Sequence, residues 1–545
     1  MKESARISKA LTGATVSLLT PCLHKRAWMS LLLVFMQLTV FAQYAWQENE
    51  ERSKSRPQLT KDIDYSLEFQ GTFSKGKTPL WLNANKHGLS SLKECNGYTR
   101  AGIFRPLSAD SIRRWGIGYG ADMAVAAGFT SEVVVQQAFV EARWLHGVLT
   151  IGAKEYPMEL KNPWLSSGSQ TLGINARPVP QARIALPKYW TLPFGNGWIH
   201  LKGHIAVGKM TDDSWQHEFT QKKSRYADDV MYHSKAGYLM FGNDYAEFPL
   251  SVELGLEMAA QYGGKPYIIG KDGNMTKVET KGGLKGLWNV FIPGGSDATD
   301  GLYHNKSGNH LGSYVFRINY NTEYWMASLY GDHFFEDHSQ MFLIDYNGYG
   351  SGEDWNKWVK NRYFMYALKD IMLGAEFRLH YGRWLKDVLV EYLHTTYQSG
   401  PYNHDRTQNI SDHIAGTDDY YNHYIYTGWQ HWGQVIGNPL YRSPIYNNDG
   451  KIDVKNNRFI AWHLGVRGEP TDNLAYRLLA TYQKAWGTYE NPFTRPHHNA
   501  SFLLEATYRL NRWSLTGAYA MDFSSDKLYG HNAGLQLTLR RCLSK

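Results

Sequence analysis

The sequence lacks several features by which common classes of protein are identified. It has only three cysteines, Cys22, Cys95 and Cys542, which are too few and too far apart for a disulfide framework or a cysteine metal site. It contains neither the H-E-x-x-H pattern of zinc peptidases nor the G-x-S-x-G turn of serine hydrolases. Its histidines also lack the spacing of metal ligands. We therefore expect no catalytic residues, no bound metal and no cofactor.

Long apolar runs are also missing beyond the N-terminal region, so the sequence predicts no membrane-spanning helix in the mature chain. At the N-terminus, Lys25 and Arg26 precede a short apolar stretch that ends in Val40-Phe41-Ala42. This arrangement predicts a secretory signal peptide over residues 1–42. A membrane-anchor helix is the alternative, but the stretch is shorter than the ~20 residues that a span needs. Residues 1–24 indicate a long leader or a misplaced start codon.

A strong net charge is absent as well. The formal net charge is +8, and the signal peptide contributes five basic residues and one acid, which leaves about +4 for residues 43–545. So small an excess does not indicate nucleic-acid binding, and we expect no nucleic-acid partner. The chain is 43% hydrophobic and 14% aromatic, which excludes a disordered protein.

What the mature chain does contain is alternation of apolar and polar side chains in segments of about ten residues. Such alternation predicts β-strands with one face in apolar and the other in polar surroundings. The apolar positions of the clearest segments are Trp115, Ile117, Tyr119, Ala121, Met123 and Val125; Ile199, Leu201, Ile205 and Val207; Tyr314, Phe316, Ile318 and Tyr320; Leu373, Ala375, Phe377 and Leu379; Ile460, Trp462, Leu464 and Val466; and Phe502, Leu504, Ala506 and Tyr508.

Both a soluble sandwich and a membrane barrel are built from such strands. Arg, Glu and His on the polar face suit a wet lumen, and aromatic residues near strand ends suit a bilayer interface. Tight turns, such as Leu145-His146-Gly147 and Leu510-Asn511-Arg512, alternate with long polar stretches, as they do in outer-membrane proteins. We therefore predict an all-β fold over residues 43–545: a transmembrane, antiparallel, up-and-down β-barrel with extracellular loops in the cell outer membrane. At ~9–11 residues a strand plus connections, the length predicts about 18 strands.

Two local patterns need a separate interpretation. Residues 71–78, GTFSKGKT, match the phosphate-binding pattern G-x-x-x-x-G-K-[ST]. The residues before them alternate like a half-exposed strand, and Pro79 follows at once without a helical pattern, so we reject nucleotide binding. Between residues 351 and 366, a capping serine, two acids and aromatic residues near helical spacing predict a short helix in a loop or plug.

An aromatic and polar tract near residue 420 gives the best candidate for a binding site. Aromatic faces stack on the C–H faces of sugars, while carboxylates and amides hydrogen-bond to hydroxyl groups. The candidate polysaccharide-binding residues are Asp418, Asp419, Tyr420, Tyr421, His423, Trp429, His431 and Trp432. Interface aromatics and ordinary polar loop residues are the alternative, which composition alone favours. The two acids are also candidate glycosidase carboxylates, whose separation the sequence does not fix.

Several stretches, taken in order, resemble the capsule assembly proteins of the Wzi family, especially the form found in Bacteroidetes. They spread over nearly the whole mature chain, and their ordered set is more specific than any one of them. The stretches are residues 79–88 (PLWLNANKHG), 165–168 (LSSG) running on to 175–181 (NARPVPQ), 232–235 (YHSK), 308–313 (GNHLGS), and 418–432 continuing into 437–440 (GNPL).

The resemblance implies an outer-membrane barrel of about 18 strands with a helical element closing its periplasmic end. It also implies a lectin-like role, in which the protein binds capsular polysaccharide or exopolysaccharide and holds it at the cell surface. Outer-membrane lipid and other capsule export components are the further partners expected. The family is not known to include enzymes, so the resemblance implies that this protein is not an enzyme. A porin-like diffusion channel and an outer-membrane glycan hydrolase are the alternatives. The chain departs from many outer-membrane barrels because residues 540–545 follow its last alternating segment without an aromatic end.

Overall fold

The computed structural model describes residues 58–111, 113–243, 248–270, 272–291, 308–336, 370–398 and 419–544, and the backbone of four two-residue strands between residues 344 and 363. The predicted signal peptide over residues 1–42 and the candidate residue Asp418 lie outside these residues. Among the helices of the described ranges, none is long and apolar enough to cross a membrane.

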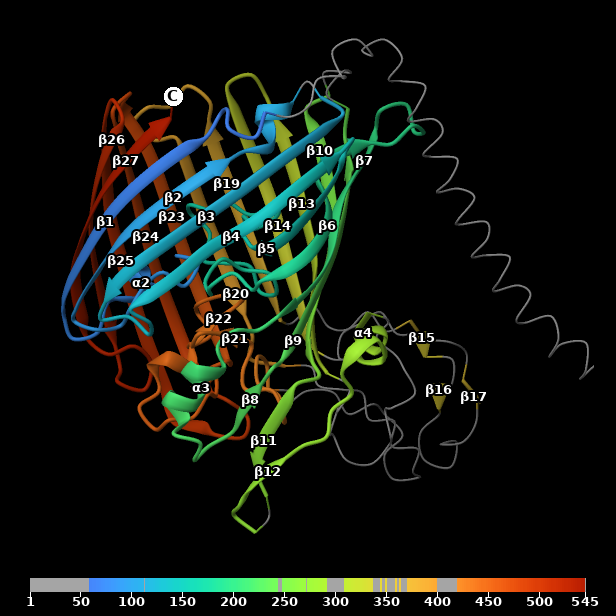
Figure 1. Cartoon of the computed structure of the whole chain (residues 1–545), viewed down its shortest axis with the longest axis vertical. Coiled ribbons are helices and arrows are strands. Elements are labelled where there is room, and N and C mark those ends of the chain that lie inside the picture. Colours follow the sequence, from blue (N-terminus) through green and yellow to red (C-terminus); the bar gives the residue numbers. More distant parts are fainter. Residues whose placement is uncertain are drawn as a thin grey trace, which may run out of the picture.

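Eighteen strands form one closed, antiparallel ring (Figure 1), in which each strand pairs with the next of the eighteen along the chain and the last, β27, pairs with β1. The strands are β1 (Asp64–Lys75), β2 (Cys95–Arg105), β3 (Trp115–Ala127), β4 (Val133–Trp144), β5 (Gly147–Ala153), β6 (Gln181–Thr191), β7 (Ile199–Lys209), β9 (Met231–Phe241), β10 (Leu250–Tyr262), β13 (Asn309–Asn321), β14 (Trp325–Glu336), β19 (Ile371–Leu379), β20 (Asp387–His394), β23 (Phe459–Thr471), β24 (Leu474–Gly487), β25 (Pro492–Leu510), β26 (Trp513–Ser524) and β27 (Asn532–Ser544). The predicted all-β, up-and-down barrel and its number of strands are confirmed.

The apolar faces of the strands point outward, as the alternation predicted. In β3, Val125 is 66% exposed and Met123 is 49% exposed, whereas Asp122 before Met123 and Ala124 between the two are buried on the inner face. In β23, Trp462 is exposed and the next residue, His463, is buried inside the barrel. An apolar outer surface and a polar inner surface are what a strand needs when lipid lies on one side and water or polar protein on the other.

The two ends of the barrel differ in the length of their connections. At one end, here named the short-turn end, strands are joined by tight turns such as residues 145–146 and 511–512. Leu145 and Asn511 have φ values of 56° and 52°, the left-handed conformation that tight hairpin turns require. Both tight turns predicted from the sequence are therefore confirmed. The opposite end, named the long-loop end, carries much longer connections, such as residues 210–230.

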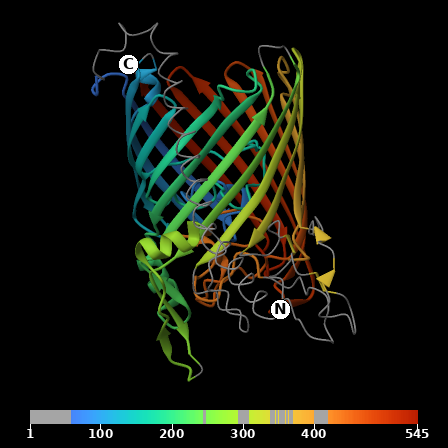
Figure 2. The same ribbon diagram turned by 90° about the vertical axis from the view of Figure 1, so that its right-hand side faces the viewer.

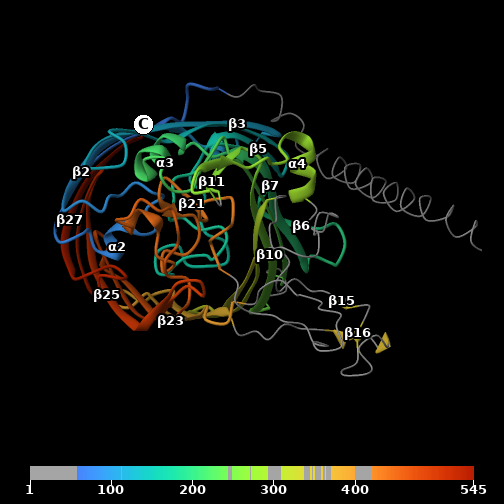
Figure 3. The ribbon, with the colours of Figure 1, turned by 90° about the horizontal axis from the view of Figure 1, so that it is seen from below.

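Segments from the long-loop end fold back into the barrel. Residues 79–94, 154–180 and 419–458, named the plug, lie within the ring of strands when the barrel is viewed along its axis (Figure 3). The buried residues of the plug share one hydrophobic cluster with inward side chains of the barrel wall. That cluster extends from Leu80 in helix α2 (Leu80–Asn83) to Val435 in strand β22 (Gln434–Val435). The lumen near the long-loop end is therefore occupied by packed protein.

The longer helices lie at the long-loop end. Helices α3 (Asp213–Thr220) and α4 (Gly283–Phe291) belong to connections on that side, next to a small sheet of β8 (Tyr226–Asp228), β11 (Lys265–Ile269) and β12 (Met275–Lys277), as Figures 1 and 2 show. At the short-turn end, the described residues form only one 3-10 turn, η2 (Leu107–Asp110). The helical element that the resemblance implies at the periplasmic end is not found among the residues described at the short-turn end, and it stays a prediction.

Two further expectations need correction. The helix predicted between residues 351 and 366 is wrong where the structure describes that stretch, because Trp358–Val359 and Arg362–Tyr363 form the two-residue strands β17 and β18. Trp, Val and Tyr also favour strands, so their helical spacing alone does not distinguish a helix from short strands. The sequence predicts that residues 540–545 lie beyond the last strand, but β27 continues to Ser544 and pairs with β1 from Ala533 to Ser544.

Candidate functional site

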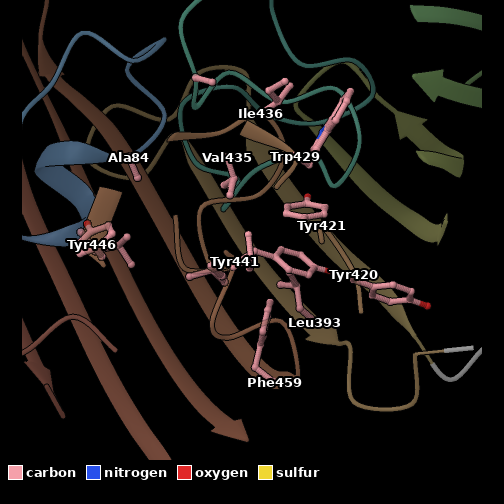
Figure 4. Packing of buried hydrophobic residues seen from close by; sticks show 14 of the residues in the cluster. Ala84, Leu393, Tyr420, Tyr421, Trp429, Val435, Ile436, Tyr441, Tyr446 and Phe459 are labelled. Carbon is pink, nitrogen blue, oxygen red and sulfur yellow. The ribbon is translucent and has the colours of Figure 1, made fainter. Parts of the chain in front are cut away.

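The predicted aromatic tract forms much of the plug core. Tyr420, Tyr421 and Trp429 are fully buried, and Figure 4 shows them among other buried residues of the same cluster. The ring of Tyr421 stacks on the ring of Tyr441, with centroids 4.0 Å apart. The ring of Tyr420 meets the edge of Phe334 from β14 at 4.9 Å. These rings already pack against protein on their faces, so sugar stacking on them requires the plug to move.

Hydrogen bonds hold the same residues in place. The Tyr421 hydroxyl accepts a bond from the Asn438 backbone N–H at 3.0 Å and donates to the carbonyl oxygen of Gln170. The indole N–H of Trp429 donates to the carbonyl oxygen of Thr171 at 3.1 Å. The tract near residue 420 is therefore anchored to the distant segment 154–180, and the two together form one body inside the barrel.

His431 is buried in the same body. Its Nδ1 lies 2.9 Å from the Arg177 carbonyl oxygen, and its Nε2 accepts a bond from the Thr211 backbone N–H at 3.2 Å. These partners assign the proton to Nδ1. Burial lowers the pKa of His431, so the ring is neutral and acts as a structural link between three segments.

Three of the described candidates keep part of their surface. Asp419 accepts hydrogen bonds from the side-chain amides of Asn422 at 3.1 Å and Asn457 at 2.6 Å. His423 stacks on Tyr426, with ring centroids 5.3 Å apart. The Trp432 ring lies against the Arg177 guanidinium, whose carbon is 4.3 Å from the ring centroid. The structure thus gathers seven of the eight predicted residues in the plug but leaves only these three at its surface.

A cavity of about 90 Å³, named the lumenal cavity, lies between the plug and the barrel wall. The 154–180 segment forms one side, and β6, β7 and β9 form the other. Its charged and aromatic lining comprises His87, Lys154, Tyr156, Glu159, Arg177, Arg183, His204, Tyr232 and Tyr238. Sequence reasoning missed this site, although Arg183 on the polar face of an alternating strand was a signal that could have marked it.

The lumenal cavity reaches solvent on the side of Pro157, which is exposed. Lys154 beside it pairs with Glu141 at 2.5 Å, and these side chains lie in the half of the barrel nearer the short turns. Glu159 pairs with Lys202 of β7 in the same half. The cavity therefore combines cations, tyrosine rings and access to water, which suits a polar ligand with apolar faces. Among the described residues, no group of three His, Cys, Asp or Glu side chains could hold a metal ion.

No protein-family model matches this sequence, and no curated protein matches it. Among solved structures, the chain is similar to Wzi from Escherichia coli, an outer-membrane protein involved in group 1 capsule assembly and a carbohydrate-binding β-barrel. The two share 14% identity with a TM-score of 0.51, over 87% of this chain and 83% of Wzi. OprD from Pseudomonas aeruginosa also aligns, with 8% identity and a TM-score of 0.43, over 90% of this chain and 98% of OprD. The likeness to Wzi shows a shared barrel fold of the outer-membrane type.

Proposed function

We propose that this protein is a lectin-like barrel of the outer membrane that binds capsular or other surface polysaccharide and retains it at the cell surface. The observation that carries the proposal is the plugged lumen with a polar, tyrosine-lined cavity beside the plug. A barrel built only to let solutes pass has no use for a packed interior, whereas a binding protein needs a fixed surface that presents several groups to a ligand. The fold shared with carbohydrate-binding Wzi supports this choice.

The outer surface supports the proposed location. Large apolar side chains stand exposed around the ring, including Val140, Ile184, Leu329 and Leu504. In water, so much exposed apolar area on one molecule would cause aggregation, whereas in a bilayer it contacts acyl chains. Aromatic pairs such as Trp115–Trp144 lie at the short-turn end, where an interface would lie.

Capsule retention in a deletion strain tests the proposal. We expect the strain to make a normal total amount of capsule but to release most of it into the medium, and the wild-type gene on a plasmid should restore the cell-bound fraction. The amount of an unrelated outer-membrane protein serves as the control for general membrane damage. An unchanged cell-bound fraction in the deletion strain would overturn the proposal.

A diffusion channel is the second candidate, and the charged lining near the short turns favours it. Arg477 pairs with Glu505 at 2.9 Å, and both side chains keep part of their exposure inside the barrel. A wet, charged vestibule of this kind is common to pores. Conductance of the purified protein in a planar bilayer separates the two candidates, because a firmly plugged barrel passes little current.

A further inference from the structure

We infer that the lumenal cavity binds the carboxylate of an acidic sugar residue, with Arg183 as the group that receives it and Arg177 as a second uncompensated cation nearby. The inference rests on the proposed function and specifies the class of polysaccharide that the protein binds. It follows from the charges that line the cavity, their partners and the polar atoms left without one.

Arg183 is a cation without an anion. It lies on the inner face of β6, and its guanidinium carbon is 3.8 Å from the centroid of the Tyr156 ring. Within the described residues, Arg183 makes no ion pair, and its buried Nε atom has no hydrogen-bond partner. A guanidinium stacked on a ring keeps its in-plane N–H groups free, and that fork matches the two oxygens of a carboxylate.

Arg177 is a second cation of the cavity lining, although the hydrogen bonds of its guanidinium lie beside the cavity. Its two terminal nitrogens bond only to hydroxyl groups, those of Thr130 at 3.0 Å and Ser131 at 3.4 Å. Its Nε is buried without a partner, and no carboxylate among the described residues lies within ion-pair distance of it. Burial lowers the pKa of Arg177 to about 10, with Asp212 opposing the shift from a distance. Arg177 therefore stays charged at neutral pH while most of its charge is uncompensated.

The other cations of this region are already neutralised. Lys154 pairs with Glu141, and Lys202 pairs with the one carboxylate of the cavity lining, Glu159. The lining of the cavity therefore carries a net positive charge, which comes from the guanidinium groups of Arg183 and Arg177. Buried charges without partners are costly, so an anion that enters the cavity recovers interaction energy that the empty site lacks.

The remaining lining indicates a sugar as the carrier of that anion. Gln181 also lines the cavity, and its buried Oε1 accepts no hydrogen bond, so a rotation of the amide would let it accept one from a hydroxyl group. Among the tyrosines of the lining, Tyr156 keeps part of its surface and can pack on C–H groups, whereas Tyr232 and Tyr238 are buried. A bare phosphate would use the Arg183 guanidinium alone, whereas a carboxylated sugar also uses the amide and this ring.

The test measures binding of the strain's own capsular polysaccharide to the detergent-solubilised protein. One sample of polysaccharide stays native, and in the other the carboxylates are reduced to neutral alcohols by carbodiimide and borohydride. We expect the native polymer to bind at least tenfold more tightly than the reduced one. We expect Arg183→Gln to weaken binding of the native polymer about tenfold and to abolish the discrimination between the two samples.

Lys188→Gln is the matched control, because it removes one positive charge from the same strand at an exposed position. It should bind both samples as the wild type does. Arg183→Lys retains the charge but loses the fork, so an intermediate affinity is expected, and it replaces Arg183→Gln if the latter fails to fold. Equal affinity for native and reduced polymer, or unaltered binding by both Arg183 variants, would overturn the inference while the proposed function stands. Wild-type protein that binds neither sample would contradict the proposed function itself.

Discussion

At the residue scale, Asp419 shows how burial changes the chemistry of a plug side chain. Burial raises the pKa of Asp419 to about 6, although hydrogen bonds from Asn422 and Asn457 oppose the shift. The neighbouring charges of Glu490 and Asp453 add to the increase. Because the pKa of an unfolded aspartate is about 3.9, the folded plug holds a proton between these two values that the unfolded segment has lost.

This shift predicts a pH dependence of the local stability of the plug. Stability should be highest below about pH 4 as far as Asp419 is concerned, and it should fall as the pH rises through 6. Between pH 5 and pH 8 the loss should be on the order of 1 kcal/mol. Hydrogen exchange of residues 419–458, corrected for the intrinsic pH dependence of exchange, measures it. Asp419→Asn should remove the difference, and a wild-type plug equally protected at both pH values would contradict the assignment.

The sequence could indicate which residue types belong to the site but not which of them are buried. Trp429 was a reasonable candidate for sugar stacking because it lies in an aromatic, polar tract. Its indole N–H instead donates a hydrogen bond to the carbonyl oxygen of Thr171, a residue 258 positions away, and no local sequence pattern predicts that contact. Arg183 is the opposite case: alternation along its strand is enough to indicate an inward position, but its lack of a partner depends on how the plug packs.

At the scale of elements, the strands were predictable because their signal is local. Side chains of a strand alternate with period two, so residues a few positions apart fix both faces. Plug packing needs contacts that no period encodes. Gly465 in β23 is an example, because a Cβ there would lie 2.8 Å from the Cβ of Leu165 in the plug. The absence of a side chain at this position lets the plug touch the wall.

On the outward face of β25, a charged substitution should destabilise the protein by an amount that depends on its depth in the bilayer. Leu504 of β25 faces outward and pairs with Tyr519, which lies near the middle of the neighbouring strand β26. Leu510 of β25 also faces outward but lies at the short turn. Leu504→Arg should lower the free energy of unfolding by about 2–4 kcal/mol in lipid vesicles, because the arginine would lie in the acyl region. Leu510→Arg, the matched control, should cost about 0–1 kcal/mol. Denaturant titration of both variants measures the difference, and equal costs would mean that β25 does not span a bilayer.

At the scale of the whole molecule, the ring and the plug are held by different forces. The ring depends on backbone hydrogen bonds between neighbouring strands, which close from β27 to β1. The plug depends on buried aromatic packing and on side-chain bonds such as Ser166 to Glu391 of β20 at 2.6 Å. One can therefore be weakened without the other.

Trp429→Ala should loosen the plug and leave the ring closed. Truncation of a fully buried tryptophan costs about 3–5 kcal/mol, and here it also leaves the Thr171 carbonyl without its donor. We expect a clear increase in planar-bilayer conductance over the wild type, with unchanged strand content by circular dichroism. Trp164→Ala is the control, since Trp164 belongs to the same plug but is 59% exposed, and it should conduct like the wild type. Identical currents from the Trp429 and Trp164 variants would show that Trp429 does not hold the lumen shut.

The direct pairing of the first and last strands has a consequence for engineering. Asp64 and Ser544 are register partners, so these distant points of the chain lie side by side at the short-turn end. A short linker could therefore join them, and the polypeptide could begin instead at another tight turn, such as the one at residues 472–473 between β23 and β24. Every strand of such a circular permutant would keep its hydrogen-bonded neighbours. The order of the strands along the polypeptide could therefore change while the barrel stays the same.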